Sequence, residues 1–96
     1  MKAYLVVDLS IHDVEGFGPY IANVPTFIAK HGGKFIVRGA VPTPVEGDWS
    51  PERMVIIEFP ARQNAEQFLQ DPGFQELAKI RHRTTFSKLV LLDGAE

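Results

Sequence analysis

Three charged residues, Asp8, Arg38 and Glu58, lie within short apolar segments of the sequence. If each segment is a strand, the alternation of side chains places all three residues on the same face of a sheet. Charges on a mostly apolar face are costly unless they are paired or bind a ligand. They could form a polar centre for a small anionic or carbonyl-containing ligand, with Arg38 as the clamp and Glu58 or Asp8 as the proton acceptor.

A structural role for the same residues is the interpretation that we favour. An arginine–carboxylate pair between two copies of the chain would fix the register of a dimer, because a buried charge needs a partner. Arg38→Ala would then weaken dimerisation. Lys34 is expected opposite Glu58 on the neighbouring strand of a hairpin.

Three further side chains could line a binding site. Tyr20 and Trp49 are amphipathic aromatics that can line a pocket and form a hydrogen bond. Tyr20 lies on the apolar stripe of a helix, so core packing is its default role, and we expect Trp49 to cover a sheet edge or a dimer partner. His12, in the loop after the first expected strand, is the histidine best placed to face a pocket.

The sequence lacks the motifs of several common catalytic and metal sites. The three histidines lack the spacing of a helical metal pair. We interpret His31 as a cation at a helix C-terminus, and His82, between Arg81 and Arg83, as part of a solvated basic turn. No serine lies in a nucleophile elbow and no glycine motif forms a phosphate loop. We therefore expect no metal and no cofactor.

Length and composition limit the class of protein. At 96 residues, with 45% hydrophobic and 23% charged residues, the chain fits one packed domain rather than a disordered segment. The net charge of −2 argues against a nucleic-acid partner, because such proteins usually carry a basic excess. The absence of cysteine excludes disulfides and thiolate sites and makes the cytoplasm the default location. No apolar run reaches the roughly eighteen residues that cross a bilayer, so we expect no membrane partner.

Short apolar runs predict four strands, because they are too short for a helical pattern. These strands are expected at residues 3–9, 35–41, 53–59 and 86–92. The proline-rich connection 42–51 is expected to be a structured flap or a partner contact.

Apolar residues at helical spacing predict helices between the strands. The first helix is expected at 13–31, with a kink or a short turn at Pro25 and a left-handed cap at Gly32. The second is expected from 62 to about 81 in two segments, because Asp71-Pro72 has the residue types that start a helix.

The order β-α-β-β-α-β predicts a single ferredoxin-like α+β domain over residues 1–96. Its four strands would form an antiparallel sheet in the order 4-1-3-2, with two helices on one face. The other face would be left uncovered, and it would carry Tyr4, Val6, Ile36, Met54 and Ile56. Exposed apolar area of that extent usually marks an interface, so we expect a homodimer with the two sheets face to face.

Several segments, taken in order, resemble one family. They are Glu15-Gly16-Phe17 with Tyr20, His31 through Gly39, Glu46-Gly47-Asp48-Trp49, Pro51 with Arg53, Ile57-Glu58-Phe59-Pro60, and Asp71-Pro72 with Phe74-Gln75. Together they cover nearly the whole chain and resemble the uncharacterised family called domain of unknown function 1330. The resemblance implies a dimeric α/β-barrel fold, shared with small monooxygenases, isomerases and stress-responsive barrel proteins, and it implies no established reaction. Ala61, where a capping Ser or Thr is frequent, and Gly73-Phe74, where Glu-Tyr is common, depart from the family's pattern.

These observations predict a homodimeric protein that binds a small apolar or carbonyl-containing molecule. The candidate ligand-binding residues are Tyr20, Arg38, Trp49 and Glu58. The resemblance also allows a cofactor-independent enzyme of the monooxygenase or isomerase kind, and the alternative is a non-catalytic interaction module. A cavity of a few hundred cubic ångströms that touches Arg38, Glu58 or His12 would favour binding, whereas a filled interior would favour the module.

Overall fold

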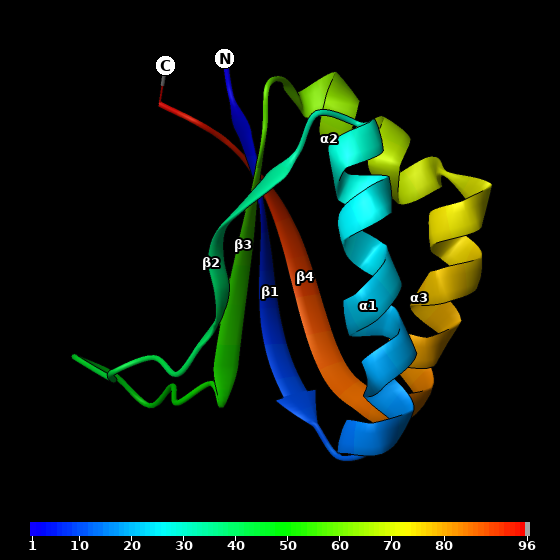
Figure 1. Ribbon diagram of the computed structural model, residues 1–96. Coiled ribbons are helices and arrows are strands. Elements are labelled where there is room, and N and C mark those ends of the chain that lie inside the picture. Colours follow the sequence, from blue (N-terminus) through cyan, green and yellow to red (C-terminus); the bar gives the residue numbers. More distant parts are fainter. Residues whose placement is uncertain (96) are drawn as a thin grey trace.

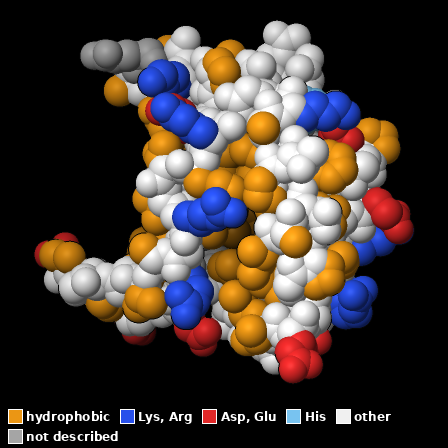
Figure 2. Space-filling view, viewed as in Figure 1, with side chains coloured by type: hydrophobic (Ala, Val, Ile, Leu, Met, Phe, Trp, Pro, Cys, Tyr) orange, Lys and Arg blue, Asp and Glu red, His pale blue; other side chains and the backbone are white. Residues whose placement is uncertain are grey.

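A single antiparallel sheet with helices on one face forms the protein (Figure 1). The computed structural model describes residues 1–95, and within them it has four strands and three helices. In chain order the elements are β1 (Ala3–Ile11), α1 (Val14–Lys30), β2 (Lys34–Ala40), β3 (Arg53–Phe59), α2 (Arg62–Gln70), α3 (Pro72–Thr84) and β4 (Thr85–Asp93). The sheet order β2-β3-β1-β4 is the predicted order read from the other edge, which confirms the ferredoxin-like fold. Seen from the same direction, the surface between β2 and α1 is hollowed and hydrophobic (Figure 2).

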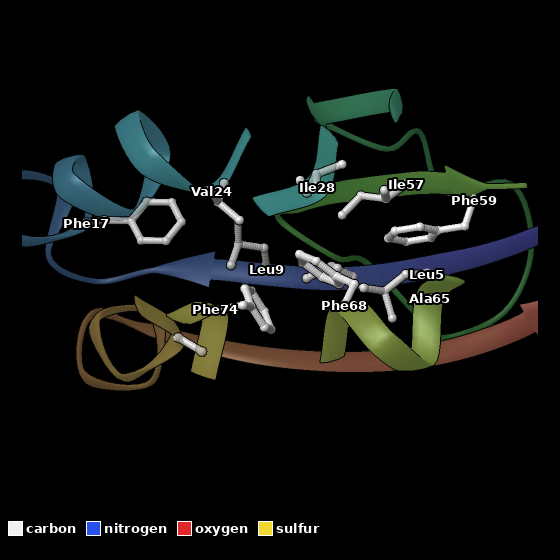
Figure 3. Close-up of a cluster of buried hydrophobic side chains, with 12 residues drawn as sticks. Leu5, Leu9, Phe17, Val24, Ile28, Ile57, Phe59, Ala65, Phe68 and Phe74 are labelled. Carbon is white, nitrogen blue, oxygen red and sulfur yellow. The ribbon is translucent and has the colours of Figure 1, made fainter. Parts of the chain in front are cut away.

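The core lies between the sheet and the helices. Alternate residues of β1, from Ala3 to Leu9, are buried on the helix side, as the period of two predicted. Three phenylalanines from β3, α2 and α3 meet beneath them (Figure 3). The ring centroids of Phe59 and Phe68 lie 5.4 Å apart, and those of Phe68 and Phe74 lie 4.1 Å apart. This cluster fixes both short helices against the sheet, since aromatic side chains bury large apolar areas.

Helix α1 continues through Pro25 without a break, so the expected short turn is wrong. The proline removes a donor to the carbonyl of Ile21, and Ile21 is exposed, so water can reach that carbonyl. The helix ends as expected, with Gly32 in the left-handed region at a φ of 80°.

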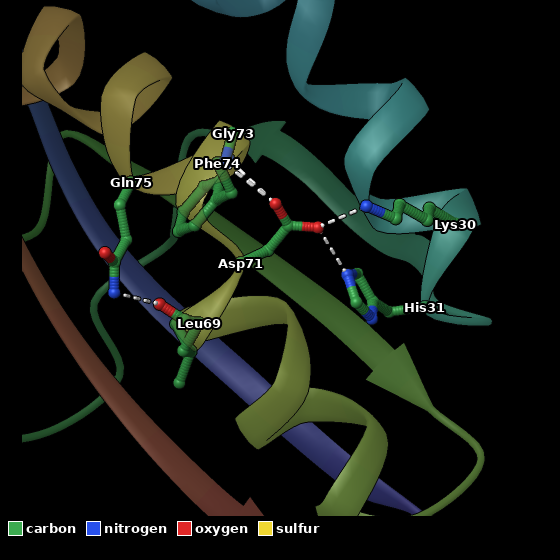
Figure 4. A network of polar contacts seen from close by, with 7 residues as sticks. All are labelled: Lys30, His31, Leu69, Asp71, Gly73, Phe74 and Gln75. Carbon is green, nitrogen blue, oxygen red and sulfur yellow. Dashed lines mark hydrogen bonds and ion pairs between the residues drawn. The ribbon is translucent and has the colours of Figure 1, made fainter.

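Asp71 joins the ends of three helices (Figure 4). As the predicted N-cap of α3, its carboxylate accepts hydrogen bonds from the backbone N–H groups of Gly73 and Phe74. Its other oxygen lies 2.9 Å from Lys30 Nζ and 2.8 Å from His31 Nε2, at the end of α1. Hydrogen bonds from His31 and Lys30 hold the pKa of the Asp71 carboxyl well below its usual range. His31 was predicted only to interact as a cation with the dipole of α1. In the structure its ring also contacts the Asp71 carboxylate, which helps to hold the end of α1 against the start of α3.

Strand β2 differs from the prediction at two β-bulges. Phe35 pairs with Ile57, but Val37 then pairs with Ile56 and Arg38 with Val55, because the register shifts at Ile36 and again at Gly39. Residues opposite each other in an antiparallel pair share a face. Arg38 therefore faces the helices with Val55 and does not share the open face with Asp8 and Glu58, as the sequence suggested.

The connection between β2 and β3 extends away from the body of the molecule (Figure 1). Trp49 in this segment is 63% exposed, and its indole N–H lies 3.5 Å from Asp8 Oδ2 at the open face of the sheet. In residues 1–95, none of the helices has the length and apolar character to cross a membrane.

Candidate functional site

A cavity of about 280 Å³ lies between the sheet and the helices. Its walls are almost wholly apolar, with Val7 and Val55 from the sheet and Val24 and Ile28 from α1. It opens to the surface at the hollow between β2 and α1 (Figure 2). An apolar cavity with a few polar groups is the usual form of a small-molecule site.

Arg38 lines this cavity because the first β-bulge turns it toward the helices. Its guanidinium lies 4.4 Å from the centroid of the Phe35 ring, which is a cation–π distance. The side chain is exposed, so the positive charge is held where solvent and cavity meet.

Arg81 of α3 is the second cation that lines the cavity, and it is only 7% exposed. Its Nε donates to Ser87 Oγ at 3.2 Å, and its Nη1 donates to Tyr20 Oη at 3.1 Å. Nη2 lies 3.2 Å from Nε2 of the exposed His82, which must accept because a guanidinium only donates. Among residues 1–95, no carboxylate forms an ion pair with Arg81.

Arg81 was not predicted as a site residue, because Arg81-His82-Arg83 in the sequence indicated a solvated basic turn. The spacing of Arg81 in the sequence indicates a buried position, because Phe74, Ala78 and Arg81 recur at helical intervals. All three residues are buried in the structure. An arginine on the apolar stripe of a helix needs neutral acceptors or an anion, and this pattern could have marked it as a site residue.

Tyr20 is the predicted site residue that the structure brings beside Arg81. Its ring stacks on Phe17 with centroids 5.2 Å apart, so it also has the expected packing role. Burial raises the pKa of the Tyr20 phenol, and the charge and hydrogen bond of Arg81 only partly offset this rise. The phenol therefore stays protonated at neutral pH, and it can donate its own O–H while accepting from Arg81.

Glu58 lies on the opposite face of the sheet, away from the cavity. Its carboxylate is 3.4 Å from Lys2 Nζ and 3.3 Å from Lys34 Nζ, and it accepts a 3.3 Å hydrogen bond from Tyr4. Partial burial raises the pKa of Glu58, but the hydrogen bonds and charges of Lys34 and Lys2 outweigh this effect and lower it overall. The predicted pairing of Lys34 with Glu58 is confirmed.

The remaining candidates also lie outside the cavity. Asp8 and Trp49 approach each other on the open face of the sheet, as described above. His12 is exposed, and its ring lies beside Phe86 with centroids 4.9 Å apart. Of the predicted site residues, the cavity therefore brings together Tyr20 and Arg38, and it adds Arg81.

Solved structures with the same fold come from several bacteria. RPA0582, a protein of unknown function from Rhodopseudomonas palustris, is 18% identical with a TM-score of 0.80, covering 99% of this chain and 83% of its own. SnoaB, a cofactor-independent oxygenase from Streptomyces nogalater, is 21% identical with a TM-score of 0.70, covering 99% of this chain and 94% of its own. A dimeric ferredoxin-like protein of unknown function from Jannaschia sp. CCS1 is 12% identical with a TM-score of 0.76, covering 98% of this chain and 100% of its own. At these identities the similarity shows the shared fold.

Curated proteins offer no match to this chain. The family model described as "Domain of unknown function (DUF1330)" matches residues 2–95, which is nearly the whole sequence. The chain therefore belongs to the DUF1330 family, as the order of its motifs predicted.

Proposed function

We propose that this protein is a homodimer that binds a small, largely apolar molecule in the cavity of each protomer. The observation that carries the proposal is the 280 Å³ apolar cavity, which opens beside Arg38. A cavity touching Arg38 is the feature that distinguishes a binding protein from a module with a filled interior.

The open face of the sheet supports the dimer. Val37, Ile56, Val6 and Val90 are matched across the four strands and form one apolar row on this face. A row of this kind in water is a typical protein interface. The proteins of similar fold include ones described as dimeric, which supports pairing of two sheets as a dimeric α/β barrel.

The chemistry of the cavity supports binding more directly than catalysis. Its charged and hydroxyl-bearing lining residues are Arg38, Arg81 and Tyr20, and among the described residues that line it there is no Asp, Glu or His. These groups donate hydrogen bonds and stabilise negative charge, whereas abstraction of a proton needs a base. SnoaB, of similar fold, is described as a cofactor-independent oxygenase, which supports a small-molecule site in this fold without assigning a reaction.

The neutral fluorescent probe N-phenyl-1-naphthylamine tests the proposal. We expect it to bind the wild-type protein with enhanced fluorescence, and Val55→Phe to reduce that binding by filling the cavity. Val14→Phe is the matched control, because Val14 is exposed at the start of α1. Native mass spectrometry of the same samples reports the dimer and any retained molecule. Equal probe binding by both variants, or no binding by the wild type, would refute the cavity as a ligand site.

A further inference from the structure

We infer that the ligand of this cavity is a small monoanion, with an apolar body and one acidic oxygen group that meets Arg81 and Tyr20. The inference rests on the proposed binding function and specifies the chemistry of the molecule bound. Arg81, at the inner wall of the cavity, is the residue that would bind the acidic group. The sequence predicted that Arg81 lies in a solvated turn.

The guanidinium of Arg81 is incompletely paired. A guanidinium has five N–H groups, and the structure gives three of them partners on Ser87, Tyr20 and His82, none of which is a carboxylate. Two N–H groups remain without a partner in the described part of the chain, on a residue that is 7% exposed and lines the cavity. A buried cation without a carboxylate is costly, and an anion in the cavity would remove that cost.

The hydroxyl group of Tyr20 also has a hydrogen left to donate. Its oxygen already accepts from Arg81 Nη1, so its own hydrogen is available for another acceptor. No acceptor within residues 1–95 takes this hydrogen, and Tyr20 lines the same cavity. Arg81 and Tyr20 therefore both have hydrogen-bond donors left for the ligand in one region of an apolar space. A carboxylate or an acidic enol has the oxygen geometry that such donors bind.

The charged residues that line the cavity are all positive. The chain as a whole carries −2, yet the charged lining residues are Arg38 and Arg81, both positive. Arg38 at the mouth would attract an anion from solvent, and Arg81 would hold it inside. The cavity volume of about 280 Å³ lies near the lower end of the range for ligand sites, so the apolar body of the ligand is small.

Two isosteric probes test the inference, 2-naphthoate and its neutral analogue 2-naphthamide. Isothermal titration of the wild-type protein should show naphthoate binding at least about tenfold tighter, since a charge-assisted hydrogen bond has about this effect. Arg81→Met should remove this preference while leaving naphthamide affinity nearly unchanged. Arg83→Met, an exposed arginine two residues along the same helix, is the matched control and should keep the preference. Tyr20→Phe should weaken naphthoate binding while keeping the ring that packs on Phe17.

The outcomes separate the two proposals. If naphthamide binds as tightly as naphthoate, or if Arg83→Met loses the preference as Arg81→Met does, the anionic ligand is refuted and the apolar site stands. If N-phenyl-1-naphthylamine does not bind the wild type, the binding function itself is refuted, whatever the result with naphthoate. Thermal unfolding of each variant shows whether it is folded, and Tyr20→Phe keeps the test decisive if Arg81→Met does not fold.

Discussion

Replacing Val90 with lysine should break the proposed dimer, because Val90 lies at the end of the apolar row on the open face of the sheet. The side chain is 56% exposed in the single chain, so a face-to-face dimer would bury the rest of it. Full burial of such a side chain contributes about 1.5–3 kcal/mol, so the part left for the interface contributes about 1 kcal/mol.

The symmetry of the dimer doubles this effect. In a two-fold interface both copies carry the substitution at the interface, so the free energy of dimerisation falls by about 2 kcal/mol. This change raises the dimer dissociation constant about 30-fold. The lysine ammonium adds a desolvation cost in the same direction, so this factor is a lower limit. The folded monomer should be little affected, because lysine on this face can reach water.

Sedimentation velocity over a range of concentrations measures the dissociation constants of Val90→Lys, Val14→Lys and Arg38→Ala. Val14→Lys makes the same chemical change at a residue that is 74% exposed on the helix side, and it should dimerise like the wild type. Arg38→Ala should also stay dimeric, since the β-bulge turns Arg38 toward the helices, and this reverses the expectation from sequence. A Val90→Lys protein that dimerises as tightly as Val14→Lys would show that the sheets do not pair through this face, and a monomeric Arg38→Ala would restore the earlier interpretation.

Two predictions concern stability. A Cβ added at Gly33 would lie 2.6 Å from Phe59 Cε1, so Gly33→Ala should lower the free energy of unfolding by about 1–3 kcal/mol through overpacking. Phe59→Leu should lower it less in the Gly33→Ala protein than in the wild type, because it removes the ring that the new methyl group would contact. Urea unfolding of the four proteins measures this coupling, and additive costs would contradict the contact. The second prediction concerns Asp71, whose pKa in the folded protein is lower than its ordinary value of 3.8. The ionised carboxylate therefore stabilises the fold above pH 3.8, and this stabilisation is lost as the pH falls through the pKa of the folded protein. Asp71→Asn should therefore weaken the acid-side loss of stability, and unfolding midpoints with the same pH slope below about pH 4 in both proteins would contradict this role.

Local patterns in the sequence predicted most of the fold. The buried side of β1 follows from strict alternation, and the junction of α2 and α3 follows from Asp71-Pro72, whose side chain and ring geometry both favour a helix start. The short turn expected at Pro25 was wrong because Ile21, whose carbonyl loses its donor, lies on the exposed side of α1. The ends of the strands differ from the prediction by at most two residues, and both ends of β3 were predicted correctly.

The candidate site was predicted less well, because its residues depend on tertiary position. Tyr20 and Arg38 were named, but their shared cavity was not visible from either residue's own segment. Arg81 was predicted to lie in a solvated basic turn with His82 and Arg83, although its spacing from Phe74 places it on the buried side of α3. The position of a charged residue in a helix is better predicted from the helix face it occupies than from the charges beside it in the sequence.

The two β-bulges of β2 explain why Arg38 could not be placed by alternation. The first, at Ile36, exchanges the faces of the residues that follow, and the second, at Gly39, restores them, so Val37 and Arg38 are inverted while Lys34 and Ala40 keep their places. Gly39 has a φ of 81°, the left-handed conformation that a glycine bulge uses, and β2 is an edge strand, where a bulge disturbs pairing on one side only. With regular alternation, Arg38 would lie on the open face, where its charge would oppose the pairing of two sheets, and Val37 would occupy the cavity wall. The inversion therefore serves both proposed roles at once, since it makes the open face more apolar and places a cation at the mouth of the cavity.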